Sequence, residues 1–386
     1  MPAPPAGARV AIISGSFGAG HDAAAREIGI RLGEHGVACD LLDIVDLYPP
    51  GLGGLLRRVY FLQLRTVPAS WRWLLGRLEG EGSRLNTAAR LVSQVGGRRT
   101  RARAATGYLA VVSTHPLASQ MLGQLRRRDR LRTPVMTYLT DASVHGLWVH
   151  ERVDLHLAIH AVAAKAALDH GARLVEVVQP AVRHGFDHPA DRGLDHATDG
   201  GFDHPTETRR AQARAQHGLP ATGALVLITG GSEGVVELVE AASDIREHGG
   251  GVPVVLCGRN DSLRRRLEDE PGVLALGWVQ DMTSLYAAVD VVVQNAGGST
   301  SLEALAARRP VLSYRCIPGH GETNAAALAD AGLAPWARDR EDLDRLLAAA
   351  LAGPVLDPHG EGDPVDGLSE QPCVGAVILR ATVGVP

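Results

Sequence analysis

The sequence predicts an α/β protein built from two parallel-sheet domains. Short apolar runs alternate with stretches of helical composition along most of the 386 residues. This alternation is typical of parallel sheets that are covered by helices on both faces. A repetitive glycine-rich segment interrupts the pattern once, and the pattern restarts after it. A chain of this length can bury two cores, so we expect two domains joined by a linker.

The first domain is expected at residues 1–182 and the second at 209–352. In the first domain, strands are predicted at 10–14, 37–42, 108–113, 135–139, 155–159 and 174–178. In the second domain they are predicted at 224–229, 254–257, 273–275, 289–294 and 310–313, with helices between them, for example at 235–247 and 299–307. Residues 353–386 lose the alternation, which predicts an irregular and partly disordered tail.

Three copies of an eight-residue unit lie between the two domains. They read GFDHPADR, GLDHATDG and GFDHPTET over residues 185–208. The unit is rich in glycine, aspartate, histidine and proline and has no apolar periodicity, so residues 183–208 are predicted to form a flexible linker. A metal site formed by His188, His196 and His204 is the alternative.

Composition excludes several classes of protein. The sequence contains no run of 18 apolar residues and no apolar leader near its start, so neither a transmembrane helix nor a secretory signal is expected. The cysteines are Cys39, Cys257, Cys316 and Cys373. Their wide spacing predicts neither a zinc site nor a disulfide framework and fits a reducing cytoplasm.

Positive charge is concentrated in residues 51–104. This stretch contains eleven arginines and only two acidic residues, together with the aromatic side chains Tyr60, Phe61, Trp71 and Trp73. Arginine beside aromatic and leucine side chains favours a face that lies on an anionic membrane surface. An arginine-rich pair of surface helices with its tryptophans in a core is the alternative. A nucleic-acid partner is not expected, because no reading motif accompanies the charge.

A glycine turn follows the first predicted strand. The stretch SGSFGAGHDAAAREI, residues 14–28, contains the turn and the start of an alanine-rich helix. It is not a phosphate-binding P-loop, because His21 and Asp22 stand where lysine and a hydroxyl residue are needed. The glycine order G-x-x-G-x-G also differs from the dinucleotide fingerprint. Asp40, at the distance of a ribose-binding acid, keeps a dehydrogenase as an alternative.

His21 is placed where this helix begins. The positive end of the helix dipole disfavours the protonated imidazole, and a neutral imidazole can accept a proton. The position therefore makes His21 a candidate general base. A histidine that only caps the turn is the alternative.

The motif SGSFGAGHDAAAREI resembles the N-terminal signature of the group containing monogalactosyldiacylglycerol synthases and processive diacylglycerol glucosyltransferases. STHPLAS at 113–119, TYLTDASVHGLW at 137–148 and VVQPAVRHGF at 177–186 are similar to further segments of that group. The resemblance implies the GT-B fold, in which two Rossmann-like domains face each other across a cleft, and it places the first glycine turn on the acceptor side.

On the acceptor side, the resemblance makes His21 the first choice of base and Asp141 the second. Gly18, Gly20 and His145 are expected beside them. His115 could equally be a structural residue at a strand end.

A second glycine turn follows the strand at 289–294. Asn295-Ala296-Gly297-Gly298 precedes a helix that opens at Ser299 or Thr300. Unpaired backbone N–H groups at that helix end suit a diphosphate without a metal, and glycine lets the backbone approach it closely. Glu303, one turn into the helix, could form a capping box with Thr300 or accept hydrogen bonds from a ribose.

The resemblance assigns the second domain to the nucleotide-sugar donor. It implies that Glu303 binds the ribose, that Glu322 and Asn324 hold the hexose, and that the backbone at Trp278 and Val279 meets the uracil. His320 replaces the usual glutamine of the hexose loop, which leaves the donor sugar open. The full predicted donor set is Gly230, Gly231, Ser232, Arg259, Trp278, Val279, Gly297, Gly298, Ser299, Thr300, Glu303, Glu322 and Asn324.

The function that the resemblance implies is transfer of a hexose from a UDP-sugar to a lipid such as diacylglycerol, with inversion at the anomeric carbon. No metal or cofactor is expected besides the UDP-sugar, and the enzyme would act in the cytoplasm, on the inner face of the cell membrane. Three alternatives remain: a transferase for a polyprenyl-linked or soluble acceptor, a UDP-sugar 2-epimerase, and a non-catalytic UDP-sugar-binding protein.

Overall fold

The computed structural model describes residues 4–5, 7–66, 92, 94–104, 107–183, 207–230, 237–247, 249–295, 297–353, 367–368 and 370–383. These residues form two compact units. The first contains the described residues up to 181, with 318–320 and 370–383, and the second contains those of 182–317 and 321–368. Several predicted features lie outside the described residues: nearly all of the repeat with its three histidines, Trp71, Trp73, Gly231 and Ser232.

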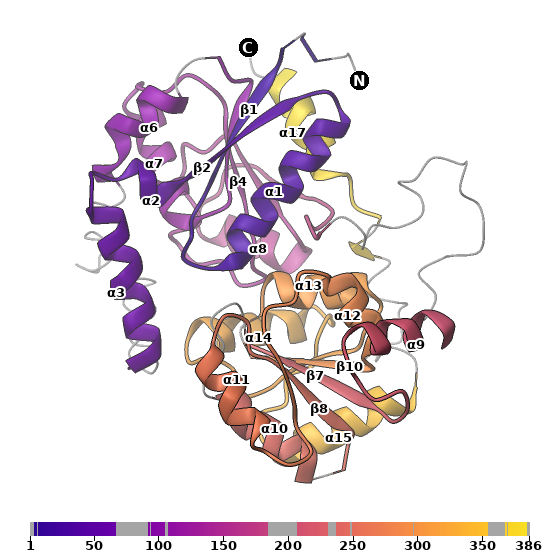
Figure 1. The fold of residues 1–386 in the computed structure, drawn as a ribbon. Helices are drawn as coiled ribbons and strands as arrows, with labels where there is room; N and C mark the ends of the chain where they lie inside the picture. The colour runs from indigo at the N-terminus through magenta and orange to yellow at the C-terminus, as the bar shows by residue number, and fades with distance from the viewer. Residues whose placement is uncertain are drawn as a thin grey trace. The chain divides into compact units, whose positions relative to one another are not determined.

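The first unit is built on a six-stranded parallel sheet with the order β2-β1-β3-β4-β5-β6. Strands β1, β2 and β4 of this sheet are labelled in Figure 1. Its strands are β1 (Arg9–Ser14), β2 (Ala38–Asp43), β3 (Ala110–Ser113), β4 (Val135–Tyr138), β5 (Leu155–Ala158) and β6 (Val175–Val177). Its helices are α1 (Ala19–Glu34), α2 (Ile44–Leu47), α3 (Leu52–Thr66), α6 (Gly97–Ala104), α7 (Pro116–Arg127), α8 (Ala161–Asp169) and α17 (Val374–Val383).

The central strands of this sheet are buried along their whole length. Every residue of β3, β4 and β5 is buried, and in β1 only Arg9 is exposed. Parallel strands that are covered on both faces need such continuous apolar runs, which is why their sequences do not alternate between apolar and polar residues.

The second unit is built on a five-stranded parallel sheet with the order β11-β10-β7-β8-β9. Its strands are β7 (Leu225–Thr229), β8 (Val252–Leu256), β9 (Leu274–Leu276), β10 (Val291–Gln294) and β11 (Val311–Ser313). The remaining helices are α9 (Glu207–Gln216), α10 (Glu237–Glu247), α11 (Asp261–Glu268), α12 (Met282–Ala288), α13 (Ser299–Ala306), α14 (His320–Asp330) and α15 (Arg340–Ala352).

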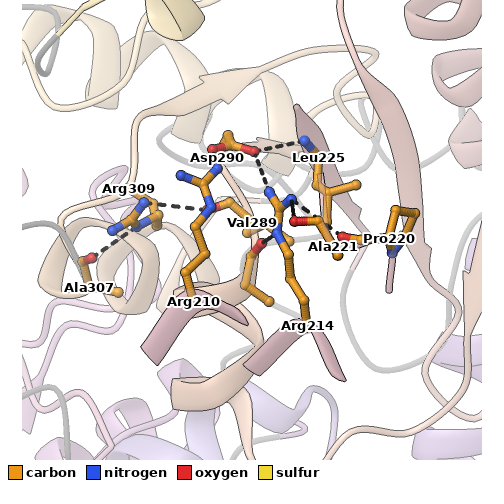
Figure 2. Close-up of polar contacts among 10 residues, drawn as sticks. Arg210, Arg214, Pro220, Ala221, Leu225, Val289, Asp290, Ala307 and Arg309 are labelled. Atoms are coloured by element: carbon orange, nitrogen blue, oxygen red, sulfur yellow. Dashed lines mark hydrogen bonds and ion pairs between the residues drawn. The ribbon is translucent and has the colours of Figure 1, made fainter. Parts of the chain in front are cut away.

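Asp290 connects α9 to the amino ends of β7 and β10 in the second sheet. Its carboxylate accepts hydrogen bonds from the backbone N–H of Leu225, at 2.8 Å, and from Arg214, at 3.1 Å, and it also pairs with Arg210 (Figure 2). Arg214 donates a further bond of 2.9 Å to the carbonyl of Ala288. These contacts lie at the amino ends of β7 and β10, so they leave the opposite edge of the sheet to the glycine turns.

The prediction of two α/β domains with parallel sheets is confirmed, and each predicted strand corresponds to an observed one. The prediction of an irregular tail at 353–386 is wrong for its last part. Residues Val374–Val383 form α17, which packs on α1, and a Cβ at Gly375 would lie 3.1 Å from the Arg31 carbonyl oxygen. The apolar run VGAVIL forms most of this helix. The glycine-rich and proline-rich residues before the run led to the prediction of an irregular tail over the whole segment.

Candidate functional site

Three loops of the first unit meet at the carboxyl edge of its sheet. β1 pairs with β3, and β3 pairs with β4, all in parallel register. The segments that follow these strands, beginning at Gly15, Thr114 and Leu139, are therefore neighbours. This edge is where ligands bind in open parallel sheets, and it contains the residues predicted for the acceptor side.

His21 is held in one orientation by the neighbouring loop. It is the third residue of α1, whose N-cap is Gly18. The Nδ1 atom of His21 lies 2.7 Å from the carbonyl oxygen of Thr114, and the Thr114 hydroxyl donates to the His21 carbonyl at 3.0 Å. A carbonyl oxygen only accepts, so Nδ1 carries the proton and the neutral ring keeps its lone pair on Nε2.

The surroundings of His21 favour the neutral ring. Burial lowers the pKa of His21, while the nearby carboxylate of Asp141 acts in the opposite direction. Asp141 is itself buried and accepts a hydrogen bond of 3.2 Å from the Thr140 hydroxyl, which also lies 3.3 Å from His21 Nδ1. His21 and Asp141, 120 positions apart in the chain, thus belong to one cluster, and His21 has the features of a proton acceptor.

Aromatic rings surround this cluster. The His21 ring meets the edge of His115 at 4.8 Å between centroids and lies 5.8 Å from Trp148. His145 lies 6.3 Å from Trp148, and burial lowers the pKa of His145 to about 4. The His21 ring is therefore in contact with the rings of both His115 and Trp148.

His115 has a structural position. It is the N-cap of α7, and its Nδ1 accepts a hydrogen bond of 3.3 Å from the backbone N–H of Leu117. Its ring stacks on Phe17 at 5.1 Å and fills the space above Gly15, where an added Cβ would come within 2.7 Å of it. Gly15 is therefore a glycine that the turn requires and that sequence reasoning missed, although the motif contains it.

The dehydrogenase alternative is not supported by the position of Asp40. This residue lies within β2, and its carboxylate pairs with Arg9 and accepts a 2.6 Å hydrogen bond from the Tyr108 hydroxyl. Both contacts lie away from the carboxyl edge of the sheet.

The second unit brings its predicted residues to the carboxyl edge of its own sheet. β10 lies between β7 and β11, and the backbone N–H of Asn295 donates to the Thr229 carbonyl at 3.3 Å. Gly230, which follows Thr229, is buried, and Gly297 and Gly298 have φ of 74° and 71°. Those angles belong to the left-handed region that favours glycine.

Helix α13 begins beside these glycines and has an open end. Its N-cap is Gly298, and no side chain caps the helix. Ser299 and Thr300 are the first two helical residues and are partly exposed. The backbone N–H groups of a first turn have no partner within the helix, so this end suits an anion.

Glu303 is not part of a capping box, because Thr300 lies inside the helix and is not its N-cap. The Glu303 side chain is buried, and its Oε1 forms an ion pair of 2.9 Å with Nε of Arg183. Sequence reasoning missed Arg183, for which the motif VVQPAVRHGF gave a position but no role.

The two residues predicted to hold the hexose lie inside α14, and they differ in exposure. Asn324 is fully buried against the glycine turn, since a Cβ at Gly297 would lie 2.7 Å from the Asn324 Cβ. Glu322 lies in the first turn of α14 and is partly exposed. Partial burial, and after it the charge of Glu322, raises the pKa of the Cys316 thiol to about 12. Glu322 is thus the more accessible of the two.

The residues predicted to meet the base follow β8 and β9, which are paired in the sheet. The Arg259 guanidinium lies 4.4 Å above the Trp278 ring, and Trp278 is 45% exposed. An exposed tryptophan held by an arginine offers a flat surface next to the backbone of Val279. The predicted donor residues that the structure describes thus share one sheet edge.

Two families match separate parts of the chain. Residues 110–178 match the monogalactosyldiacylglycerol (MGDG) synthase family, and residues 223–349 match the glycosyl transferases group 1 family. The chain is 28% identical over 239 residues to a processive diacylglycerol beta-glucosyltransferase of Bacillus pumilus, and 25% identical over 250 residues to one of Bacillus licheniformis. The predicted resemblance to this group is confirmed.

These alignments cover 60% and 63% of this chain, and they span only 58% and 60% of the length of the two relatives.

Solved structures show the same architecture. UGT71G1 from Medicago truncatula, complexed with UDP-glucose, has a TM-score of 0.58 at 12% identity, and the match covers 99% of this chain and 100% of that one. The glycosyltransferase SnogD from Streptomyces nogalater has a TM-score of 0.54 at 17% identity, covering 98% and 99%. The chain has the GT-B fold. Within the described part of the GT-B chain, every helix is too short or too polar to cross a lipid bilayer.

Proposed function

We propose that this protein is a glycosyltransferase that moves a hexose from a UDP-sugar to the hydroxyl of a membrane lipid such as diacylglycerol. The observation that carries the proposal is the locked imidazole of His21, with its proton on Nδ1 and its lone pair on Nε2. The similarity to diacylglycerol glucosyltransferases supports the class of reaction and of acceptor.

In the proposed reaction, Nε2 of His21 takes the proton of the acceptor hydroxyl while that oxygen attacks the anomeric carbon. The bond from this carbon to the diphosphate oxygen breaks, UDP leaves, and the configuration inverts. Asp141 stabilises the imidazolium that forms, because a carboxylate close to a histidine favours its charged form. The mechanism requires the two units to bring Nε2 and the anomeric carbon together when both substrates are bound.

The departing UDP gains negative charge, and the second unit offers groups that suit it. The uncapped end of α13 and the backbone at Gly297 and Gly298 are preorganised donors of the kind that stabilise leaving groups. In this proposal Glu303 binds the ribose, Glu322 meets the hexose, and no metal or cofactor takes part.

Helix α3 is the surface that we propose for contact with the membrane. One side of it, with Leu52, Leu56 and Tyr60, packs on the core of the first unit. The adjacent side exposes the apolar side chains of Leu55, Val59 and Leu62, which are 55%, 52% and 61% exposed.

Arg58 lies beside this apolar stripe, three residues from Leu55 and four from Leu62, whereas Arg57 lies on the opposite side of α3. Arg57 and Arg58 are exposed on α3, and Arg57 also donates a hydrogen bond of 3.3 Å to the hydroxyl of Ser16 in the first glycine turn. Apolar side chains beside arginine suit the interface of an anionic bilayer. We infer that α3 rests on the inner face of the cell membrane, close to the proposed acceptor site.

Incubation with a panel of radiolabelled UDP-sugars and vesicles containing diacylglycerol tests the function. The expected product is a chloroform-soluble glycolipid of inverted anomeric configuration. Label that stays in the aqueous phase as an epimerised UDP-sugar would show a 2-epimerase, and binding of UDP without turnover would show a non-catalytic protein.

A further inference from the structure

Arg183 contacts the carboxylate of Glu303 from outside α13. It is the last described residue before the repeat, and its side chain is 35% exposed, whereas that of Glu303 is 6% exposed. The ion pair at 2.9 Å gives the buried carboxylate a cationic neighbour, and both residues belong to the second unit. A buried carboxylate needs such a neighbour, because an unpaired charge in the interior is costly.

The same guanidinium reaches a second loop. Its Nη1 donates a hydrogen bond of 3.4 Å to the backbone carbonyl of Gln280. Gln280 follows Trp278 and Val279 directly, in the loop between β9 and α12. One side chain therefore connects the carboxylate proposed to bind the ribose with the loop proposed to meet the base.

Tyr286 approaches the other carboxylate oxygen. Its hydroxyl lies 3.5 Å from Glu303 Oε2 and 3.4 Å from the carbonyl of Thr300. The Tyr286 side chain is fully buried, and burial raises its pKa well above the ordinary value, so the phenol keeps its proton. Arg183 thus contacts Oε1 of Glu303, and the Tyr286 hydroxyl lies near Oε2. These two neighbours together fix the orientation of the carboxylate.

We propose that Arg183 is a positioning residue that orients Glu303 toward the ribose and couples this carboxylate to the loop that meets the base. The inference rests on the proposed function, since it assumes that the second unit binds the nucleoside of a UDP-sugar. Arg183 acts on the ligand through Glu303, and its bond to the Gln280 carbonyl fixes the guanidinium relative to the loop. A direct contact with the diphosphate is not part of the proposal.

A double-mutant cycle tests this role. Binding of uridine and of UDP is measured by calorimetry for the wild-type protein, R183M, R183K, E303Q and R183M/E303Q. R183M should weaken both ligands by a similar factor, about tenfold, and R183K should restore part of the loss. In the E303Q background, adding R183M should change either affinity less than about twofold, because the group through which it acts is already neutral.

A matched control is R246M. Arg246 is also a partly exposed arginine in an ion pair of the second unit, with Glu270 at 3.7 Å, and it belongs to α10. R246M should leave both affinities unchanged. R183M alone leaves the Glu303 carboxylate without its cationic partner and could fail to fold. The double variant R183M/E303Q has no such unpaired charge. In that case, the affinities of R183M/E303Q against E303Q, and of R183K against wild type, still decide whether Arg183 acts through Glu303.

Two results would overturn the inference. A loss of UDP binding in R183M with uridine binding intact would show that the arginine contacts the diphosphate. An equal loss from R183M in the wild-type and E303Q backgrounds would show that it does not act through Glu303. If the wild-type protein binds neither ligand, the proposed function fails, and the inference fails with it for that separate reason.

Discussion

Acid should destabilise the first unit through His156, a buried histidine of β5. The side chain is 0% exposed, and burial lowers its pKa from 6.5 to about 4, against a weaker opposing effect of the Leu174 carbonyl. Because the folded-state pKa is the lower one, the unfolded chain binds this proton first as the pH falls. The stability contribution is therefore complete above pH 6.5 and is lost progressively down to about pH 4.

The size of this effect follows from the two pKa values. Between pH 7 and pH 5, linkage predicts a loss of about 2 kcal/mol from this one residue. Replacing His156 with leucine removes the titrating group, so H156L should be about 2 kcal/mol less sensitive to this pH change than the wild-type protein. Leucine also avoids leaving a polar side chain in the sheet core.

Urea unfolding followed by circular dichroism at pH 7, 6 and 5 measures the difference. H35L is the control, because His35 is exposed at the end of α1. If the free-energy gap between H156L and wild type is the same at pH 7 and pH 5, then His156 is not buried as a neutral ring and the reasoning is wrong.

Three further predictions concern the site and the surface. H21N can still donate to the Thr114 carbonyl but has no acceptor at Nε2, so kcat should fall by about 10² to 10⁴ with UDP affinity unchanged; equal turnover would remove His21 as the base. G15A should cost about 1–3 kcal/mol in urea unfolding, because its Cβ meets His115, whereas G18A, whose nearest atom is 3.9 Å away, should cost less; equal costs would contradict the packing. Affinity for anionic vesicles, measured by co-sedimentation, should fall by about tenfold or more when serine replaces the three residues of the α3 stripe. L168S, which alters a similarly exposed leucine on α8, should leave the affinity unchanged. Equal binding by both variants would refute the membrane face. The stripe variant carries L55S, V59S and L62S.

The strands were predictable because burial on both faces demands continuous apolar runs. β1 and β10 are such runs, and each is followed by glycines that mark its carboxyl end. Short apolar runs bounded by turn residues leave few alternatives when they recur in alternation with helices. The fold and the positions of the glycine turns therefore follow from local sequence.

The contacts that define the site could not be predicted in the same way. The partner of His21 Nδ1 is a backbone carbonyl at Thr114, and backbone atoms have no sequence signature. Arg183 and Glu303 are 120 residues apart, and nothing local to either residue indicates the other. The capping-box alternative for Thr300 and Glu303 fails for a different reason: the two residues have the right spacing, but the helix begins at Ser299 and its N-cap is Gly298.

The return of α17 to the first unit affects how this protein can be divided. A fragment that ends at the repeat would lack the last helix of its own core, and α1 would expose the surface at Arg31 that Gly375 covers. Separate expression of the two halves should therefore yield a first half that aggregates unless residues 370–386 are fused back to it. Because β1 and α17 belong to the same unit, proteolysis near either element should weaken that unit.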